Sequence, residues 1–365
     1  MKYDVAVVGA GIIGAAVARE VARAGATVVV VDREQPCSRT TWAAAGMLSP
    51  QAESDRPGDF LRLLLRARDA FPPLVHELEE DTGIALGYRT EGTLLVALTE
   101  EDEAELEERL AWQTSEGLDV ERLDGDEVRR LEPALSPLVR WALRFPGDHQ
   151  IDNRQLGNAI WFAAAAAGAE FRIGDLVRRI AMEGTTALVL DSGERVEAKR
   201  IVVAGGSWSG LLEGLPRSLP VAPVHGQLMS LTASPPLLRH VTGSPRGYLV
   251  PRSDGRLIAG TTVESTGFRT SVTPAGLHRI ISIALEMVPG LAHLPVGSHW
   301  SGLRPGTPDG LPILGADPIH PELLYATGHY RNGILLGPLT GQLVGALALG
   351  NDPGYELDPF RVDRF

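Results

Sequence analysis

The chain has 365 residues, which at roughly 100 to 200 residues per domain favours two domains, or one large domain with a second inserted into it. Hydrophobic residues at 44% and charged residues at 22% are ordinary for a globular protein, so disordered, collagen-like and coiled-coil classes are excluded. A net charge of −12 repels nucleic acid and anionic membrane surfaces, so the composition favours a small-molecule partner and no nucleic acid.

Cysteine and histidine usage gives no sign of a metal site. The one cysteine, Cys37, cannot form an internal disulfide, and the nine histidines are too scattered to make a zinc cluster with it. We therefore expect a cytoplasmic protein without a metal ion. A signal peptide is rejected because Asp4 interrupts the first apolar run and because cleavage would remove a glycine motif.

The N-terminal part of the chain has the pattern of a βαβ unit. Residues 3–8 form an apolar, strand-like run that ends at Gly9, residues 11–24 are expected to form a helix closed by Gly25, and residues 27–31 are expected to form a second buried strand. Parallel strands of this kind need helices as cover. No second unit follows directly, so we expect the chain to return to this sheet later.

The middle of the chain alternates helices and strands. Residues 60–82 are expected to form a helix, residues 89–98 a strand, and residues 100–116 an acidic helix whose charges face solvent. Residues 153–167 form a further predicted helix, with Asp152 as its N-cap.

Later strands again end in glycine. The apolar strand 200–204 runs into Gly205, strand signals dominate residues 221–258, and the strand 323–326 is followed by Gly328. We therefore predict an α/β fold with a Rossmann-like nucleotide-binding domain assembled from discontinuous segments, plus a strand-rich α+β substrate-binding domain. The segments assigned to the nucleotide-binding domain are 1–85, 146–220 and 301–365, and those assigned to the substrate-binding domain are 86–145 and 221–300.

The last predicted helix, within residues 332–351, carries no charge. Its length would suit a membrane span, but Pro338 and several glycines favour a buried helix of a globular core and no membrane insertion. Gly337, Gly341 and Gly345 share one helix face, which we expect to pack closely against a sheet.

The glycine motif after the first strand indicates a dinucleotide site. Gly9, Gly11 and Gly14 form a G-x-G-x-x-G between a strand and a helix, where they allow a tight turn, close approach of a pyrophosphate and close helix packing, respectively. Asp32, at the end of the second strand, is placed to accept hydrogen bonds from ribose hydroxyls. A carboxylate there disfavours NADP despite the neighbouring Arg33.

The identity of the dinucleotide is less directly encoded. A nicotinamide enzyme usually continues with further βαβ units, whereas this chain breaks off after the second strand. Residues 39–47 are mostly small or hydroxyl-bearing, which suits a backbone beside a flat ring and a pyrophosphate, but an ordinary Ala-rich helix start explains them as well. The residues by themselves leave FAD and NAD open.

A resemblance to a known family decides for FAD. The motifs that carry it are G-A-G-I-I-G with Asp32, R-T-T-x-A-A-A-G-M, R-R-L-E-P ending at Pro133, V-V-A-G-G-S-W-S from Val202, W-S-G-L-R-P-G-T-P-D-G-L-P from Trp300, and G-H-Y-R-N-G-I-L-L-G-P from Gly328. Together they resemble the D-amino acid oxidase family of flavoproteins over the whole chain, and within it the glycine oxidases of thiazole (thiamine) biosynthesis. The resemblance implies non-covalent FAD, oxidation of a small amino acid by oxygen to an oxo acid, ammonia and hydrogen peroxide, and a homo-oligomer such as a tetramer.

The same resemblance assigns roles to individual residues. Positions that match FAD contacts are Ile12, Ile13, Asp32, Arg33, Thr40, Thr41, Ala45, Gly46, Met47 and Val177, together with the loop beside the flavin, His329, Tyr330, Arg331, Asn332, Gly333, Ile334 and Leu335. Positions that match substrate contacts are Arg304 and Arg331. Four positions depart from the family pattern, namely Trp42, Asn153, Arg246 and Val263, of which the last two are expected to flank the substrate pocket.

The chemistry inferred from the residues agrees with this resemblance. The planar fork of an arginine suits an amino acid carboxylate, and Arg304 and Arg331 both lie at loop positions where ligands gather in α/β folds. The phenol of Tyr248 is expected to close the pocket, with a satisfied core tyrosine as the alternative. Hydride transfer to flavin N5 needs a neutral amine and correct orientation, so no catalytic base is assigned, and His329 is expected to hydrogen-bond backbone. The last helix is expected to begin near Gly337 and to aim its N-terminus at the flavin.

The expected function is therefore oxidation of glycine, with sarcosine and small D-amino acids as close competitors. One alternative is an FAD-dependent dehydrogenase of D-amino acids, proline or a 2-hydroxy acid that passes electrons to a carrier, and another is a flavin-binding subunit without turnover. Covalent flavin attachment is not expected, because Cys37 is the only thiol and belongs to the nucleotide region.

Overall fold

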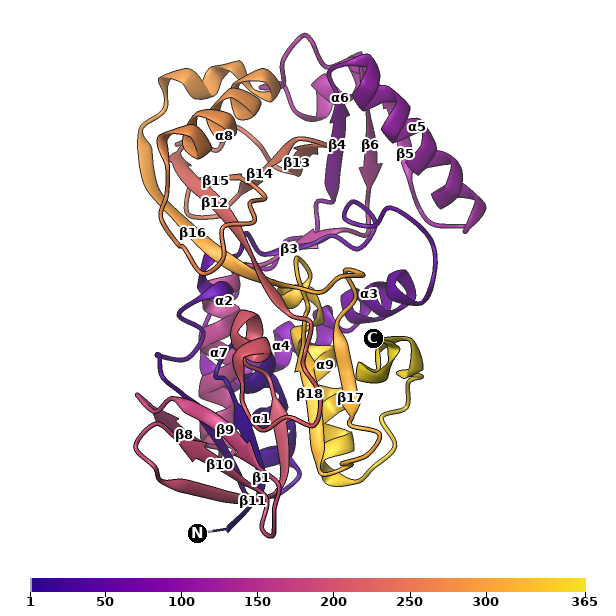
Figure 1. Ribbon diagram of the computed structural model, residues 1–365. Helices are drawn as coiled ribbons and strands as arrows, with labels where there is room; N and C mark the ends of the chain where they lie inside the picture. The colour runs from indigo at the N-terminus through magenta and orange to yellow at the C-terminus, as the bar shows by residue number, and fades with distance from the viewer. Residues whose placement is uncertain (1) are drawn as a thin grey trace.

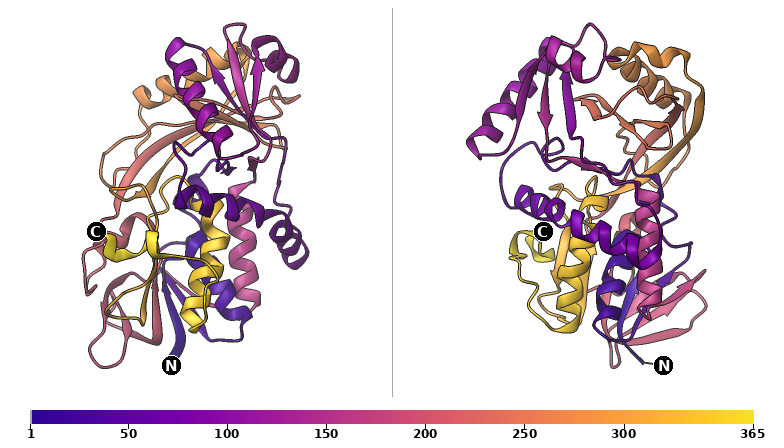
Figure 2. Two further views of the ribbon diagram at one scale, coloured as in Figure 1. Left: turned by 90° about the vertical axis from the view of Figure 1, so that its right-hand side faces the viewer. Right: turned by 180° about the vertical axis from the view of Figure 1, so that it is seen from behind.

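Two large sheets organise the chain, which is described over residues 2–365 in a computed structural model (Figure 1). The first sheet has the strand order β17-β18-β11-β1-β2-β8, with β9 and β10 paired beside β11. The second sheet has the order β16-β12-β15-β14-β13-β4-β6-β5, and β3 and β7 form a separate two-stranded ladder. All three views place the two large sheets at opposite ends of the molecule (Figures 1 and 2). The fold is thus α/β with more than one sheet, as the sequence predicts.

The first sheet has a parallel centre built from segments far apart in the sequence. Its strands are β1 (Lys2–Val8), β2 (Val28–Asp32), β8 (Glu170–Ile173), β9 (Val177–Ala181), β10 (Ala187–Leu190), β11 (Arg195–Val203), β17 (Ile313–Ala316) and β18 (Leu323–Thr327). β1 runs parallel to both β2 and β11, and β18 runs parallel to β11. The return of the chain to this sheet is therefore confirmed.

Three helices pack together on the first sheet. They are α1 (Ile12–Arg23), α7 (Asn153–Ala166) and α9 (Gly333–Leu349), and α1 packs against the other two. No helix within residues 2–365 has the length and apolar character needed to cross a membrane.

The glycine face of α9 packs against a helix, which corrects the expected packing against a sheet. A Cβ added at Gly341 would lie 2.7 Å from the Cβ of Ala16, and one added at Gly337 would lie 3.1 Å from a side-chain carbon of Ile12. Both neighbours belong to α1. The glycine spacing predicts a smooth face, but it does not specify which element approaches that face.

The second sheet carries helices of its own. Its strands are β4 (Thr93–Ala97), β5 (Glu121–Asp124), β6 (Trp141–Phe145), β12 (Ala222–Thr232), β13 (Val241–Ser244), β14 (Gly247–Pro251), β15 (Arg256–Gly260) and β16 (Val296–Gly306). Its helices are α5 (Glu100–Ser115), α6 (Gly125–Leu131) and α8 (Pro274–Met287). Ile280 and Ala284 of α8 pack on Met229 and Leu257 in one apolar cluster. The domain limits expected from the sequence stay a prediction.

The remaining elements refine two expectations. They are α2 (Thr40–Ala43), β3 (Met47–Leu48), α3 (Asp59–Asp69), α4 (Phe71–Thr82), β7 (His149–Gln150) and short 3₁₀ turns, of which Gly206–Leu211 follows β11. The helix predicted over residues 60–82 is two helices, because prolines begin the first turn of α4 and proline is favoured there. The strand predicted over residues 89–98 is shorter, and Arg89 instead makes an isolated bridge with Gln150.

Candidate active site

One large cavity reaches both sheets. From the first sheet it is lined by the turn after β1 and the loop before α9, and from the second by Leu228, Tyr248 and Arg304. Residues from distant parts of the chain therefore meet at a single site. Of the residues predicted for cofactor or substrate, those that line it are Gly9, Gly11, Ile12, Ile13, Asp32, Arg33, Thr40, Thr41, Ala45, Gly46, Met47, Val177, Tyr248, Arg304, His329, Tyr330, Arg331, Asn332, Gly333 and Ile334.

The glycine turn after β1 requires glycine for two separate reasons. Gly9 has a φ of +101°, which disfavours other residues, and a Cβ there would lie 2.5 Å from the carbonyl oxygen of Ala204. A Cβ on Gly14 would lie 1.9 Å from the carbonyl oxygen of Gly9, so only glycine lets α1 start this close to the strand. Gly14 lies outside the cavity lining, and its contribution is this packing.

Asp32 holds the glycine turn in shape. Its carboxylate accepts hydrogen bonds from the backbone N–H groups of Ala10, at 2.7 Å, and Glu34, at 2.9 Å. A carboxylate has about four acceptor positions, so two protein contacts leave room for ribose hydroxyls. Beside it, the guanidinium of Arg33 lies 4.7 Å from the ring centre of Trp208, which also lines the cavity.

The segment from Arg39 to Met47 joins the two halves of the cavity. The hydroxyl of Thr41 accepts a hydrogen bond from the first amide of α1, on Ile12, at 3.1 Å. The hydroxyl of Thr40 donates to the carbonyl oxygen of Leu303 in β16 at 2.7 Å. The hydroxyl residues of this run therefore fix protein backbone around the site.

Two of the departures from the family pattern concern this segment, since Trp42 belongs to it and Asn153 contacts it. The amide nitrogen of Asn153 donates to the carbonyl oxygen of Thr41 at 2.7 Å, and its oxygen accepts from Arg252 at 3.0 Å. Trp42 lies outside the cavity lining, where its ring meets the edge of Trp300 at a centroid distance of 5.9 Å. Asn153 thus supports the site from outside the cavity, and Trp42 does not narrow it.

Arg304 is held by neutral groups. Its guanidinium donates to the hydroxyl of Thr261 at 2.7 Å and to the carbonyl oxygen of Thr262 at 3.2 Å. A Cβ on Gly226 would lie 2.3 Å from the guanidinium, so this glycine gives the side chain its space. Both partners are uncharged, so neither forms an ion pair with the guanidinium of Arg304.

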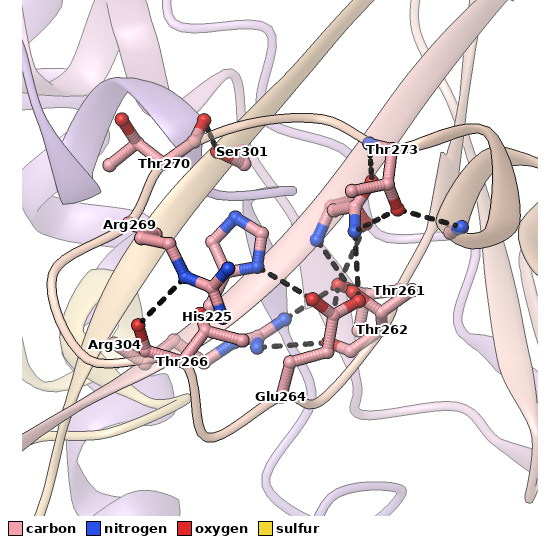
Figure 3. A network of polar contacts seen from close by, with 12 residues as sticks. His225, Thr261, Thr262, Glu264, Thr266, Arg269, Thr270, Thr273, Ser301 and Arg304 are labelled. Carbon is pink, nitrogen blue, oxygen red and sulfur yellow. Dashed lines mark hydrogen bonds and ion pairs between the residues drawn. The ribbon is translucent and has the colours of Figure 1, made fainter.

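Arg304 lies in strand β16, which corrects the loop position expected from the sequence. A polar network fixes the segment after β15 whose Thr261 and Thr262 accept hydrogen bonds from Arg304, and no sequence motif marks this network (Figure 3). The carboxylate of Glu264 contacts His225 Nδ1 at 2.9 Å and accepts from the amide of Gln227 at 2.8 Å. The backbone N–H of Gln227 donates to the hydroxyl of Thr262 at 3.0 Å. Burial opposes the charged form of Glu264, but these hydrogen bonds together hold its pKa below the usual value. An isolated bridge between His225 of β12 and Glu264 brings these residues together.

Tyr248 and His329 are uncharged groups in the cavity wall. Burial raises the pKa of the Tyr248 phenol, with Arg304 opposing that shift, so the phenol stays a hydrogen-bond donor. His329 is 2% exposed, and burial lowers its pKa to about 3. Its Nε2 atom contacts the hydroxyl of Thr340 at 3.0 Å, which corrects the expected bond to backbone.

Arg331 lies in the cavity wall as an ion pair. Its Nε atom lies 2.9 Å from a carboxylate oxygen of Glu53, another lining residue. The negative charge of Glu53 raises the pKa of Arg331. Glu53 belongs to no sequence motif, so the sequence did not identify it as a residue of the site.

Three predicted residues and the predicted start of the last helix are corrected. Leu335 is buried in an apolar cluster away from the cavity lining, and Arg246 and Val263 do not line the cavity either. Arg246 pairs instead with Glu286 at 2.6 Å. The last helix begins at Gly333, earlier than the predicted start near Gly337, so its N-terminus lies at the cavity wall.

The residues present fit a dinucleotide such as FAD. The cavity wall has glycine at the turn before α1, so no side chain of that turn occupies the space where phosphates bind at a helix N-terminus. The cap residue of α1 is Gly11, and it brings no side-chain hydrogen bond of its own to the first turn. Asp32 lies at the end of the neighbouring strand, as a ribose contact requires.

Comparison with known proteins agrees with this geometry. The sequence model of the DAO family, described as FAD dependent oxidoreductase, matches residues 4–347. The chain belongs to this family. It is 36% identical to the glycine oxidase of Geobacillus kaustophilus, over 100% of this chain and 97% of that protein.

Two further comparisons extend the family assignment. The crystal structure of the glycine oxidase from Geobacillus kaustophilus covers 100% of this oxidoreductase with a TM-score of 0.96 and 35% identity, and 99% of that chain is covered in return. The bifunctional protein ThiO/ThiG of Synechocystis sp. is 38% identical over 99% of this oxidoreductase. The match spans 54% of that relative, about half of its length.

The flavin of this oxidoreductase is expected to be released by acid. Cys37 is buried, and burial raises the pKa of its thiol to about 12, so it is a poor nucleophile for covalent attachment. Acid precipitation of the purified protein should leave all of the yellow colour in the supernatant. Colour retained in the washed pellet would count against non-covalent binding.

Proposed function

We propose that this FAD-dependent amino acid oxidase acts on glycine, with sarcosine and small D-amino acids as close alternatives. The products are the 2-oxo acid, hydrogen peroxide and ammonia, with methylamine in place of ammonia when sarcosine is the substrate. The observation that carries the proposal is Arg304, whose guanidinium lines the cavity with only neutral protein partners. An arginine in that state is suited to a carboxylate, which it can bind through two parallel hydrogen bonds. The glycine oxidase named among its relatives supports the choice of substrate.

The protein's own groups bind and orient the substrate. Arg304 holds the carboxylate, and the protonated phenol of Tyr248 offers a further donor in the same wall. Neither Tyr248 nor the neutral His329 has to gain or lose a proton, so the amine releases its proton to water. The N-terminus of α9 brings the positive end of a helix dipole to the cavity, where it favours negative charge.

Bound FAD supplies the redox chemistry, since it accepts a hydride from the α-carbon of an amine and is reoxidised by oxygen. We propose that it is held without a covalent bond by the glycine turn, Asp32 and the Arg39 to Met47 segment. These parts all line the cavity.

The biological setting is a further part of the proposal. We propose that the product serves thiamine thiazole synthesis. The support is the family resemblance together with the bifunctional relative ThiO/ThiG.

We also propose a cytoplasmic location, supported by the single thiol of Cys37, and a homo-oligomer such as a tetramer, supported by the family resemblance.

An anaerobic experiment followed by admission of air tests the function. Glycine added to the purified holoenzyme without oxygen should bleach the visible flavin absorbance, and air should restore it while glyoxylate, ammonia and hydrogen peroxide accumulate. Bleaching without recovery in air would identify a dehydrogenase. No bleaching with glycine, sarcosine or D-alanine would overturn the proposal.

The rate of flavin reduction at sub-saturating glycine should rise between about pH 6 and about pH 9, because only the neutral amine reacts. The pKa of His329 lies at about 3 and that of Tyr248 is raised, so neither group is expected to titrate in this range. Stopped-flow reduction of the parent and of His329→Ala should therefore give the same slope against pH. A rise that disappears in His329→Ala would make the histidine a base.

A further inference from the structure

A charged pair shares the wall of the cavity with Arg304. Arg331 and Glu53 line the same cavity and contact each other at 2.9 Å. Tyr248 lines the same cavity, and the charges of Arg304, Glu53 and Arg331 all influence the pKa of its phenol. Arg331 is therefore already matched by a carboxylate of the protein, whereas Arg304 is not.

The backbone on either side of Glu53 is fixed by buried polar groups. The carboxylate of Asp148, which is 0% exposed, accepts hydrogen bonds from the N–H groups of Gln51 at 3.2 Å and Ala52 at 2.9 Å. The guanidinium of Arg109, from α5, donates to the carbonyl oxygens of Gln51 and Ala52 and to that of Ser54. Glu53 thus lies between anchored residues, and its side chain is only 16% exposed.

The arrangement of charges selects the charge of the ligand. Arg304, Arg331 and Glu53 together carry a single net positive charge, which matches one carboxylate. A second carboxylate on the substrate would meet an arginine that is already paired and a glutamate of like charge. Like-charge contacts across a binding site are unfavourable, and such repulsion is a common source of specificity.

We propose that Glu53 is a specificity-determining residue that restricts this cavity to amino acids with one carboxylate. It does so by neutralising Arg331, which would otherwise bind a second carboxylate of the substrate. The inference rests on the proposed function, since it takes the substrate to be an amino acid held by Arg304.

The test compares two substrates that differ by one carboxylate. Iminodiacetate is sarcosine with a carboxylate added to its methyl group. In Glu53→Gln, the ratio of kcat/KM for iminodiacetate to kcat/KM for sarcosine should rise by about tenfold or more over the parent, because Arg331 is then free and the repulsion is gone. The same holoenzymes titrated with the unreactive ligands malonate and acetate, and followed by the flavin spectrum, should show the same shift in relative Kd.

Two control variants separate the charge of Glu53 from other effects. Glu53→Asp keeps the negative charge and should keep the parental ratio within about threefold. Glu286→Gln removes a carboxylate that pairs with Arg246 outside the cavity lining, so it changes the net charge equally and should leave the ratio unchanged. Arg331→Gln removes the arginine of the pair and leaves the charge of Glu53 without a partner. The affinity for malonate, relative to that for acetate, should therefore fall.

The outcomes distinguish this inference from the proposed function. If the parent oxidises sarcosine but neither Glu53→Gln nor Arg331→Gln changes the ratios, Glu53 does not set specificity. Glu53→Gln could instead lose activity with glycine and sarcosine, without faster oxidation of iminodiacetate and without tighter binding of malonate. That result would place Glu53 on the substrate amine and overturn the inference. If the parent oxidises neither amino acid, the proposed function fails, while the malonate and acetate titrations still decide the role of Glu53.

Discussion

Arg304→Ala should lower kcat/KM for glycine by about 100-fold or more, because removing one partner of a buried charge pair costs roughly 2 to 5 kcal/mol. The visible flavin spectrum should stay nearly unchanged, since Arg304 contacts Thr261 and Thr262 and neither belongs to the glycine turn. Steady-state oxygen consumption against glycine concentration measures the effect. Most of the loss should appear in KM if the arginine holds the carboxylate equally before and during the reaction.

Two variants complete this test. Arg304→Lys should also be impaired, because an ammonium group cannot reproduce the planar fork of a guanidinium. Arg246→Ala removes an arginine that pairs with Glu286 outside the cavity lining, and it should behave like the parent. An Arg304→Ala enzyme with an unchanged kcat/KM for glycine would remove Arg304 from the substrate site.

Gly14→Ala should weaken FAD binding by at least about tenfold, because overpacking of this kind costs roughly 1 to 3 kcal/mol or more. The added Cβ would lie 1.9 Å from the carbonyl oxygen of Gly9, which is backbone and cannot rotate away. The start of helix α1 would have to move away from the turn at Gly9, and both of these parts line the cavity. The ratio of flavin to protein after dialysis, and the Kd for added FAD, measure the result.

A second glycine provides the matched control for this variant. Gly290 has room for a Cβ, with the nearest atom at 4.0 Å, and it lies in a 3₁₀ turn of the second half of the chain. Gly290→Ala should keep full flavin content. If Gly14→Ala also keeps its FAD as firmly as the parent, the glycine turn is not shaped for the dinucleotide in the way we describe.

The parts of the site that follow from local sequence were predictable. The turn at Gly9 requires a positive φ and close approach of backbone, so the glycines are visible in the sequence as a motif between a strand and a helix. The helix over Asn153–Ala166 was equally predictable, because Asp152 accepts hydrogen bonds from two amides of its first turn.

The parts that depend on contacts between distant segments were not predictable. Glu53 meets Arg331 only because Asp148 and Arg109 hold its loop against the cavity, and none of these residues belongs to a motif. Arg246 shows the opposite error, since the family resemblance placed it beside the substrate pocket, whereas its side chain pairs with Glu286 outside the cavity lining.

The misplaced start of the last helix has a local cause. Proline is favoured in the first turn of a helix, so Pro338 indicated a start nearby. In the structure Pro338 lies inside α9, and the helix already begins at Gly333. The consequence is functional, because the earlier start brings the helix N-terminus to the cavity wall.

We propose that this oxidoreductase recognises an amino acid by its carboxylate and oxidises the adjacent carbon. The most direct measurement is anaerobic flavin reduction of the parent holoenzyme by glycine and by glycinamide, in which a neutral amide replaces the carboxylate. Glycine should reduce the flavin, and glycinamide at the same concentration of neutral amine should be slower by about 100-fold or more, because the amide leaves Arg304 without its charged partner. Equal rates with the two amines, or no reduction by glycine, would contradict the account.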